Sequence, residues 1–149
     1  MDGAQPAIAA ARGTFRLPFR FSLRLGLVSG PRMEEMERDM RFAAVLNQDG
    51  GTLRTTDVSA FADRLRQTLE AAGHSVQVDI VAGREIAAAL ERAVAKRNVD
   101  VVIAGGGDGT ISTAATLLMH KKKALAILPA GTMNLFARAL ASRRRWMRR

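Results

Sequence analysis

The stretch VDVVIAGGGDGT, residues 99–110, decides the fold that the rest of the sequence has to fit. Its first half, Val99–Ala104, is apolar apart from Asp100 and rich in β-branched residues, which is typical of a strand buried on both faces of a sheet. Four glycines and Asp108 follow, and a helix is predicted to start at Thr110. Glycines at this point allow a sharp turn and let a ligand approach the backbone without meeting a Cβ atom. A strand, a glycine-rich loop and a helix start in this order predict a binding site for an anion such as phosphate.

Strands and helices alternate on both sides of this stretch. Three further strands are predicted, at Arg41–Leu46, Ser75–Val81 and Ala124–Leu128. Helices are predicted after each of the four strands, with Thr56 or Asp57 capping the first, Gly83 opening the second, the third running from Thr110 to about His120, and the last covering Met133–Ala141. Such alternation predicts an α/β fold, a Rossmann-like parallel sheet flanked by helices.

Residues that follow neighbouring parallel strands meet at the carboxyl edge of the sheet. After the fourth strand, residues 128–132 (LPAGT) repeat the glycine–threonine helix start, so Gly131 and Thr132 are expected beside the first loop. Asn47 with the glycines at positions 50 and 51 is a weaker candidate for a third wall. No lysine follows the glycines, which excludes a Walker loop, and the glycine spacing is not the dinucleotide pattern.

Asp108 requires its own explanation, because a carboxylate repels phosphate groups. A Mg²⁺ ion, a water shell or a substrate hydroxyl can lie between the two. Alternatively, Asp108 only bonds amides at the helix start. The four surrounding glycines favour the functional interpretation. Thr110 either caps the helix or donates its hydroxyl to a phosphate oxygen.

Length and composition limit the function classes. The chain has 149 residues, 48% of them hydrophobic, and no cysteine, which indicates one domain of ordinary size without disulfides or Cys-ligated metal. The net charge is +9, and five of these charges come from arginines at residues 143–149. A mildly basic domain with 5% aromatic residues argues against nucleic-acid binding. The sequence shows neither a secretory signal nor a membrane-spanning run, so a cytoplasmic location is expected.

The ends of the chain differ from its middle. Residues 40–142 form the predicted domain. In residues 1–39, Phe and Leu alternate with Arg, Ser, Gly and Pro over positions 15–27, a pattern open to an edge strand or to a segment on an anionic membrane. The preferred prediction for 1–39 is a poorly ordered extension. Residues 143–149 are expected to be a basic tail.

Two motifs together resemble one family. GGGDGT (residues 105–110) with LPAGTMNLFAR (residues 128–138) is similar to the amino-terminal lobe of the diacylglycerol kinase catalytic family, in particular the bacterial lipid kinases. The resemblance covers about residues 40–142, and VLN at 45–47 with two glycines at 50–51 resembles the family's first-strand signature. NAD kinases share GGDGT but do not usually show the second motif. The alternatives are therefore an NAD kinase-like enzyme and a non-catalytic nucleotide-binding module.

The resemblance implies ATP-dependent phosphorylation of a lipid hydroxyl, such as that of diacylglycerol, with Mg²⁺ as a further cofactor. It also implies peripheral contact with the inner face of a membrane, while the oligomeric state, a homo-oligomer included, is left open. The expected ATP contacts are Asn47, Gly106, Gly107, Asp108, Gly109, Thr110, Ile111, Ser112, Thr113, Gly131 and Thr132.

Two departures from the family pattern limit this expectation. The Thr or Ser that the family places after its second strand has no clear match near Val81. The family's second lobe, which supplies the acceptor pocket, the metal carboxylates and the proton acceptor, is absent from this sequence. No metal ligand is therefore assigned, Asp108 is given a supporting catalytic role only, and the chain alone is expected to bind nucleotide but to be a poor kinase.

Overall fold

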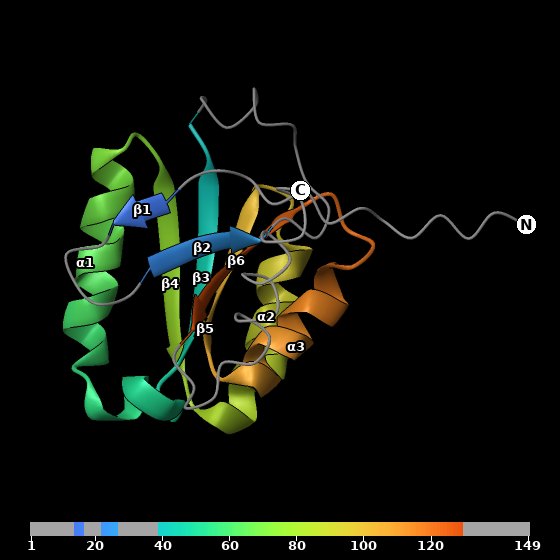
Figure 1. Cartoon of the computed structure of the whole chain (residues 1–149). Helices are drawn as coiled ribbons and strands as arrows, with labels where there is room; N and C mark the ends of the chain where they lie inside the picture. Colours follow the sequence, from blue (N-terminus) through green and yellow to red (C-terminus); the bar gives the residue numbers. More distant parts are fainter. Residues whose placement is uncertain (1–13, 17–21, 27–38, 130–149) are drawn as a thin grey trace, which may run out of the picture.

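The computed structural model describes residues 14–16, 22–26 and 39–129, and Figure 1 shows how their elements are arranged. Strands, α-helices and short 3-10 helices (η) follow one another along the chain. Their order is β1 (Thr14–Arg16), β2 (Ser22–Gly26), β3 (Arg41–Asn47), η2 (Gly51–Thr55), α1 (Val58–Ala71), β4 (Ser75–Val81), η3 (Gly83–Glu85), α2 (Ile86–Ala95), β5 (Val101–Gly106), α3 (Asp108–Leu118) and β6 (Ala124–Pro129).

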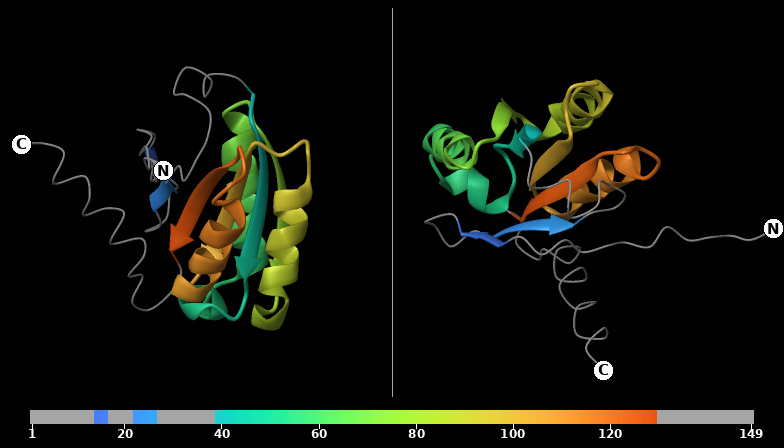
Figure 2. Two further views of the ribbon diagram at one scale, coloured as in Figure 1. Left: turned by 90° about the vertical axis from the view of Figure 1, so that its right-hand side faces the viewer. Right: turned by 90° about the horizontal axis from the view of Figure 1, so that it is seen from above.

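The strands form one sheet in the order β1-β2-β6-β5-β3-β4. The four strands β6, β5, β3 and β4 are parallel to one another. Parallel neighbours need a crossover connection, which α1, α2 and α3 supply. Helix α1 packs on one face of this sheet, and α2 and α3 pack on the other (Figure 2). The α/β prediction with a parallel sheet flanked by helices is confirmed.

Strand β5 lies in the middle of the parallel sheet, and each of its six residues is buried. Val101 and Ile103 belong to the core cluster with α1, whereas Val102 and Ala104 belong to the cluster with α2 and α3. This alternation confirms the prediction of a strand covered on both faces. Each fully buried aliphatic side chain stabilises the fold by about 1.5–3 kcal/mol relative to exposure.

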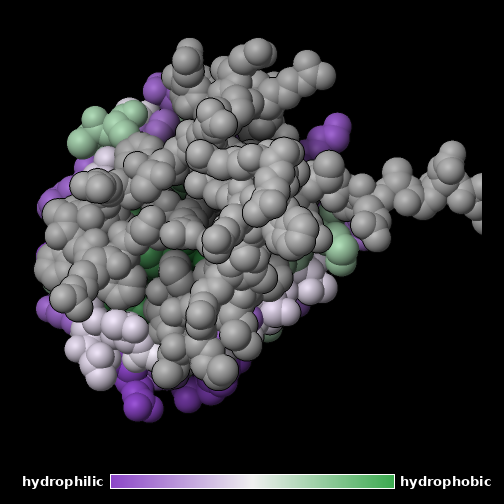
Figure 3. All heavy atoms as spheres, in the orientation of Figure 1, coloured by the Kyte–Doolittle hydropathy of each residue, from purple (hydrophilic) through white to green (hydrophobic). Residues whose placement is uncertain are grey.

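Helix α1 shows how the predicted signals act. The Asp57 side chain caps it and accepts a hydrogen bond from the Ala60 N–H at 3.0 Å. Gly73 follows the helix at a φ of +86°, a conformation that glycine adopts without strain. The outer side of α1 carries exposed polar residues such as Asp63 and Gln67, and purple, hydrophilic atoms appear along the left margin of Figure 3 beside paler and green ones. No helix in the described ranges combines the length and apolarity needed to cross a bilayer.

The segments Thr14–Arg16 and Ser22–Gly26 differ from the preferred expectation for residues 1–39. They form β1 and β2, and β2 pairs antiparallel with β6 at the edge of the parallel sheet. The alternating pattern at positions 15–27 was open to an edge strand or to a segment on a membrane. The two described segments are strands. The rest of 1–38, together with the predicted last helix and the basic tail at 143–149, lies outside the described residues.

The structure corrects the predicted bounds of two elements around the glycine-rich stretch, the strand before it and the helix after it. Strand β5 starts at Val101 and continues to Gly106, because Gly105 still pairs with Leu46 of β3 and Gly106 with Pro129 of β6. Helix α3 begins at Asp108 with Gly107 as its N-cap, two residues before the predicted start, and ends at Leu118. The only described glycines with positive φ are at positions 51 and 73. The chain therefore passes from strand to helix without a left-handed turn.

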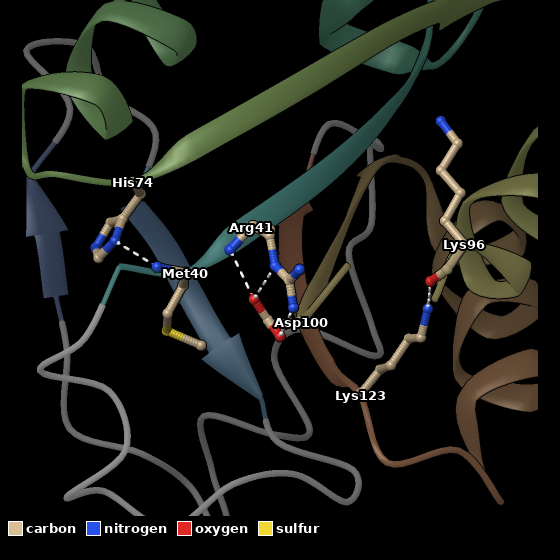
Figure 4. A network of polar contacts seen from close by, with 6 residues as sticks. All are labelled: Met40, Arg41, His74, Lys96, Asp100 and Lys123. Carbon is tan, nitrogen blue, oxygen red and sulfur yellow. Dashed lines mark hydrogen bonds and ion pairs between the residues drawn. The ribbon is translucent and has the colours of Figure 1, made fainter. Parts of the chain in front are cut away.

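At the amino-terminal edge of the parallel strands, polar groups pair with one another (Figure 4). The Asp100 carboxylate accepts hydrogen bonds from the backbone N–H of Arg41 at 2.9 Å and from its Nε and Nη2 atoms at 3.1 and 3.2 Å. The Met40 N–H donates to Nδ1 of His74 at 3.2 Å. The Lys123 ammonium donates to the backbone carbonyl of Lys96. This edge joins the starts of β3 and β5 to the neighbouring turns.

Candidate functional site

At the opposite, carboxyl-terminal edge, three connections surround an open cleft of about 460 Å³. They follow β3, β4 and β5, whose parallel pairing places their ends at the same edge of the sheet. Clefts at this edge are the usual ligand sites of open α/β sheets, and their volumes are commonly about 300–1,000 Å³. The described lining residues are Asn47, Gly50, Gly83, Arg84, Ile86, Ala87, Gly107, Gly109, Thr110 and Thr113.

The glycines at this edge have different roles. A Cβ atom on Gly105 would lie 2.5 Å from Cδ2 of Leu46, and one on Gly106 would lie 2.6 Å from Oγ1 of Thr110. Gly106 is needed because β5 packs closely against α3, whereas Gly105 is crowded by side chains of the neighbouring strands β3 and β6. A Cβ atom on Gly109 would meet nothing within 4 Å, although Gly109 lines the cleft. Gly109 therefore leaves space that a ligand can use.

Hydrogen bonds between side chains and backbone join the three connections. Nδ2 of Asn47 lies 3.4 Å from Oγ1 of Thr110, a long hydrogen bond. Oδ1 of Asn47 accepts from the Asp49 N–H at 3.0 Å, and Oδ2 of Asp49 accepts from the Gly83 N–H at 2.7 Å. The chain Thr110–Asn47–Asp49–Gly83 thus connects the start of α3 with the turn after β4. It fixes the walls of the cleft relative to one another.

The electrostatics of the cleft favour an anion. Gly107 caps α3 without a side-chain hydrogen bond, and the N-terminus of this helix opens at the cleft lining. Amides at a helix N-terminus carry partial positive charge and bind anions. Among the described lining residues, Arg84 is the only charged one. The amides of this helix start and the charge of Arg84 would therefore both attract a phosphate group in the cleft.

The structure brings together about half of the predicted contacts. Asn47, Gly107, Gly109, Thr110 and Thr113 line the cleft. Thr110 is buried in the first turn of α3, so it is not the N-cap residue. Four other predicted contacts do not line the cleft, and two more lie outside the described residues. The four are Gly106, Asp108, Ile111 and Ser112, and the two are Gly131 and Thr132.

Ile111 and Gly106 have structural reasons to be absent from the cleft lining. Ile111 is fully buried in the core cluster that α2 and α3 share. Gly106 is the last residue of β5 and is buried against Thr110. Both support the loop instead of facing a ligand in the described cleft.

The strand that precedes the second predicted loop ends at the same edge of the sheet as β5. Strand β6 is parallel to β5, and Gly106 is level with Pro129 in the pairing register. The carboxyl ends of β5 and β6 therefore lie side by side. The positions of Gly131 and Thr132 themselves lie outside the described residues.

Sequence reasoning missed the wall that follows β4. Arg84, Ile86 and Ala87 line the cleft there, next to Gly83. The family motif predicts only a Thr or Ser hydroxyl in this segment. Two features of the sequence could have indicated this wall. Parallel strands place every following connection at the same edge of the sheet, and Arg84 stands three residues after Val81.

The described residues do not fit a magnesium site on their own. Within the described ranges, no three carboxylate or imidazole groups are placed to hold a metal ion. The described cleft lining contains no carboxylate. Mg²⁺ is usually held by one or two carboxylates together with substrate phosphates. The described lining of the cleft therefore supplies no carboxylate ligand for Mg²⁺.

Comparisons with known proteins agree with the motifs. Residues 41–147 match the family model for the diacylglycerol kinase catalytic domain, which is more than half of the chain. A protein of Stenotrophomonas maltophilia (strain K279a) named "Probable lipid kinase YegS-like" is 40% identical over 94 residues, which cover 54% of this chain and 29% of that protein. Proteins with the same name are 62% identical over 42 residues in Klebsiella pneumoniae (strain 342) and 38% identical over 73 residues in Cronobacter sakazakii (strain ATCC BAA-894).

These alignments are local. They cover 27% and 46% of this chain in the Klebsiella and Cronobacter comparisons, and 14% and 24% of those relatives. The chain thus spans less than a third of the length of the three relatives. The family match, the parallel sheet and the cleft after the glycine-rich strand agree with one another, and the chain belongs to the diacylglycerol kinase catalytic domain family.

Proposed function

We propose that this chain is the nucleotide-binding lobe of an ATP-dependent lipid kinase that phosphorylates a lipid hydroxyl such as that of diacylglycerol. The family match and the names of the relatives support a lipid kinase. The single observation that carries the nucleotide site is Gly109, which lines the cleft at the start of α3 and has open space where a Cβ would be.

The ATP phosphates are proposed to lie on the amides of the first turn of α3, next to Gly109. Hydrogen bonds to charged groups contribute about 1.5–3 kcal/mol each, before the cost of removing water. Three or four such bonds are sufficient for weak to moderate nucleotide affinity. Thr110 and Asn47, which are hydrogen-bonded to each other, fix the position of this turn relative to β3.

In the proposed reaction, the bond between the γ-phosphorus and the oxygen of ADP breaks. A new bond forms between that phosphorus and the lipid hydroxyl oxygen, and the hydroxyl proton passes to a base. A Mg²⁺ ion would neutralise phosphate charge when bound. The described cleft holds the nucleotide, and the acceptor pocket and the base are proposed to lie in the part of the relatives that this chain does not match.

This division of labour predicts binding without efficient catalysis by the chain alone. A rate enhancement of ~10⁶ requires ~8 kcal/mol of transition-state stabilisation. Loss of a general base alone reduces the rate by about 10²–10⁴-fold. The lipid acceptor is the proposed partner. A cytoplasmic location with peripheral contact at the inner face of the membrane is proposed because ATP and lipid meet there.

The test is calorimetric titration of ATP into the full 149-residue chain and its Gly109→Val variant. Valine fills the space beside the first turn of α3, so the ATP affinity should fall about 10- to 100-fold, the equivalent of one charge-assisted hydrogen bond. Ala88→Val is the matched control, since Ala88 is exposed on α2 and does not line the cleft. It should bind ATP like the wild type.

Two results would contradict the proposal. One is an unchanged ATP affinity in Gly109→Val when thermal unfolding shows a folded variant. The other is the acceptor preference of a chain extended to the length of the relatives: transfer of phosphate from ATP to NAD in preference to diacylglycerol would favour the NAD kinase-like alternative.

A further inference from the structure

One charged residue lines the cleft from a turn that the motifs do not include. Arg84 lies in η3, between β4 and α2, and its side chain is exposed. It lines the cleft together with Gly107, Gly109 and Thr110 from the connection after β5. It therefore shares one cleft with the helix start proposed to bind phosphate.

The backbone of this turn is held in place on both sides of Arg84. The Gly83 N–H donates to Oδ2 of Asp49 at 2.7 Å, and the Ala82 N–H donates to Oε2 of Glu85 at 3.3 Å. Arg84 thus stands on an anchored turn at the carboxyl edge of the sheet. A long side chain on an anchored turn loses little backbone entropy when it binds a ligand.

These bonds also engage two carboxylates near Arg84, one in the turn and one in the connection after β3. Asp49 and Glu85 accept hydrogen bonds from backbone amides. No hydrogen bond or ion pair joins Arg84 to any other residue that the structure describes. Its guanidinium therefore keeps its donors for a ligand, and these planar donors match the geometry of phosphate oxygens.

We propose that Arg84 recognises the phosphate groups of the bound nucleotide and sets a preference for nucleotides with more phosphates. This inference rests on the proposed function, because it needs a nucleotide in the cleft. The amides of α3 supply partial charges, whereas Arg84 adds a full positive charge. A full charge attracts ATP more strongly than AMP, since ATP carries more negative charge.

The experiment is calorimetric titration of ATP, ADP and AMP into the full chain and its Arg84→Gln variant. The ATP affinity should fall about tenfold and the AMP affinity by about twofold or less, because the charged hydrogen bonds to the distal phosphates are lost. The dependence of ATP affinity on salt concentration should become weaker. Arg84→Lys should restore part of the ATP affinity through its charge.

Arg92→Gln is the matched control, because Arg92 is exposed on α2, does not line the cleft and changes the net charge equally. It should leave the ATP affinity unchanged. An Arg84→Gln variant with wild-type ATP affinity would overturn the role of Arg84. Equal losses of affinity for ATP and AMP would also overturn this role, because they would indicate that the substitution displaces the turn.

The Gly109→Val variant separates the two proposals. If Gly109→Val weakens ATP binding and Arg84→Gln does not, the nucleotide site stands and the role of Arg84 is overturned. If the wild-type chain binds none of the three nucleotides, both proposals fail.

Discussion

The two edges of the parallel sheet differ in what their polar groups bind. At the amino-terminal edge, the Asp100 carboxylate accepts three hydrogen bonds from Arg41, so the polar groups there bind one another (Figure 4). At the carboxyl-terminal edge, the side chains of Asn47 and Asp49 join the connections, while Gly109 leaves space in front of a helix start.

This difference separates stability from binding. Pairs of polar groups at the amino-terminal edge stabilise the fold and have little capacity left for a ligand. Amides and a cation around the open cleft can exchange water for an anion. Substitutions at the first edge should therefore change the free energy of unfolding, and substitutions at the second should change nucleotide affinity. The predictions below test how far this separation holds.

The largest effect is expected for Gly106→Ala, which should change both the free energy of unfolding and the nucleotide affinity. The new Cβ atom would lie 2.6 Å from Oγ1 and 2.8 Å from Cβ of Thr110, a β-branched residue with little rotational freedom. Displacing Thr110 should lower the free energy of unfolding by about 2–3 kcal/mol, as overpacking does, and should weaken ATP binding about tenfold. Chemical denaturation and calorimetry measure the two quantities.

Gly109→Ala is the control for Gly106→Ala, three residues further along. Its Cβ atom would meet nothing within 4 Å, so the free energy of unfolding should stay the same or rise by a few tenths of a kcal/mol. If Gly106→Ala were as stable as Gly109→Ala, the close packing of β5 against α3 would not be the reason for a glycine there.

A smaller effect on stability, without an effect on binding, is expected for Asp100→Ala. The variant loses the acceptor for three donors of Arg41, and the side chains are 53% and 33% exposed for Arg41 and Asp100. The free energy of unfolding should fall by about 1–2 kcal/mol, since this partly exposed network is screened by water. Isothermal titration should give the wild-type ATP affinity. A tenfold loss of that affinity would show that the two edges are coupled.

The smallest effect concerns the pH dependence of the amino-terminal edge. Burial lowers the pKa of the Lys123 ammonium, and the opposing attraction of Asp100 is smaller. Because the folded-state pKa lies below the unfolded one, the unfolded chain binds more protons between the two values. The wild-type free energy of unfolding should therefore rise with pH in the alkaline range just below the ordinary lysine pKa.

Lys123→Met removes this titration, so its free energy of unfolding should show a smaller rise over the same pH range. Denaturation at a series of alkaline pH values compares the two proteins. Equal slopes would mean that Lys123 does not contribute to the pH dependence of stability.

Much of the fold could be predicted because local patterns carry it. The spacing of Phe61, Leu65 and Leu69 predicted α1, and these three residues are buried as expected. The alternation of strand and helix predicted the parallel sheet. The ends of β5 and α3 were misplaced, because the packing of Gly105 between Leu46 and Leu128 involves residues far apart in sequence. No local pattern reports a contact of that kind.

Only part of the site could be predicted, because local motifs cover some of its residues and not others. Asn47 and the residues from Gly107 to Thr113 belong to motifs, so the sequence placed them near a ligand. Arg84 belongs to no motif, and only the topology of β4 brings it to the cleft. Ile111 lies within the motif, but its side chain points into the core because α3 buries that face.

The sequence alone determined the alternating elements, the family and the glycine-bearing helix start, since these depend on residues near one another in the chain. Only the tertiary structure decided which glycines are required by close packing, which glycine leaves room in the cleft, and which charged residue lines the cleft. Those outcomes depend on distances between atoms of different strands and helices, and such distances exist only once the sheet has formed.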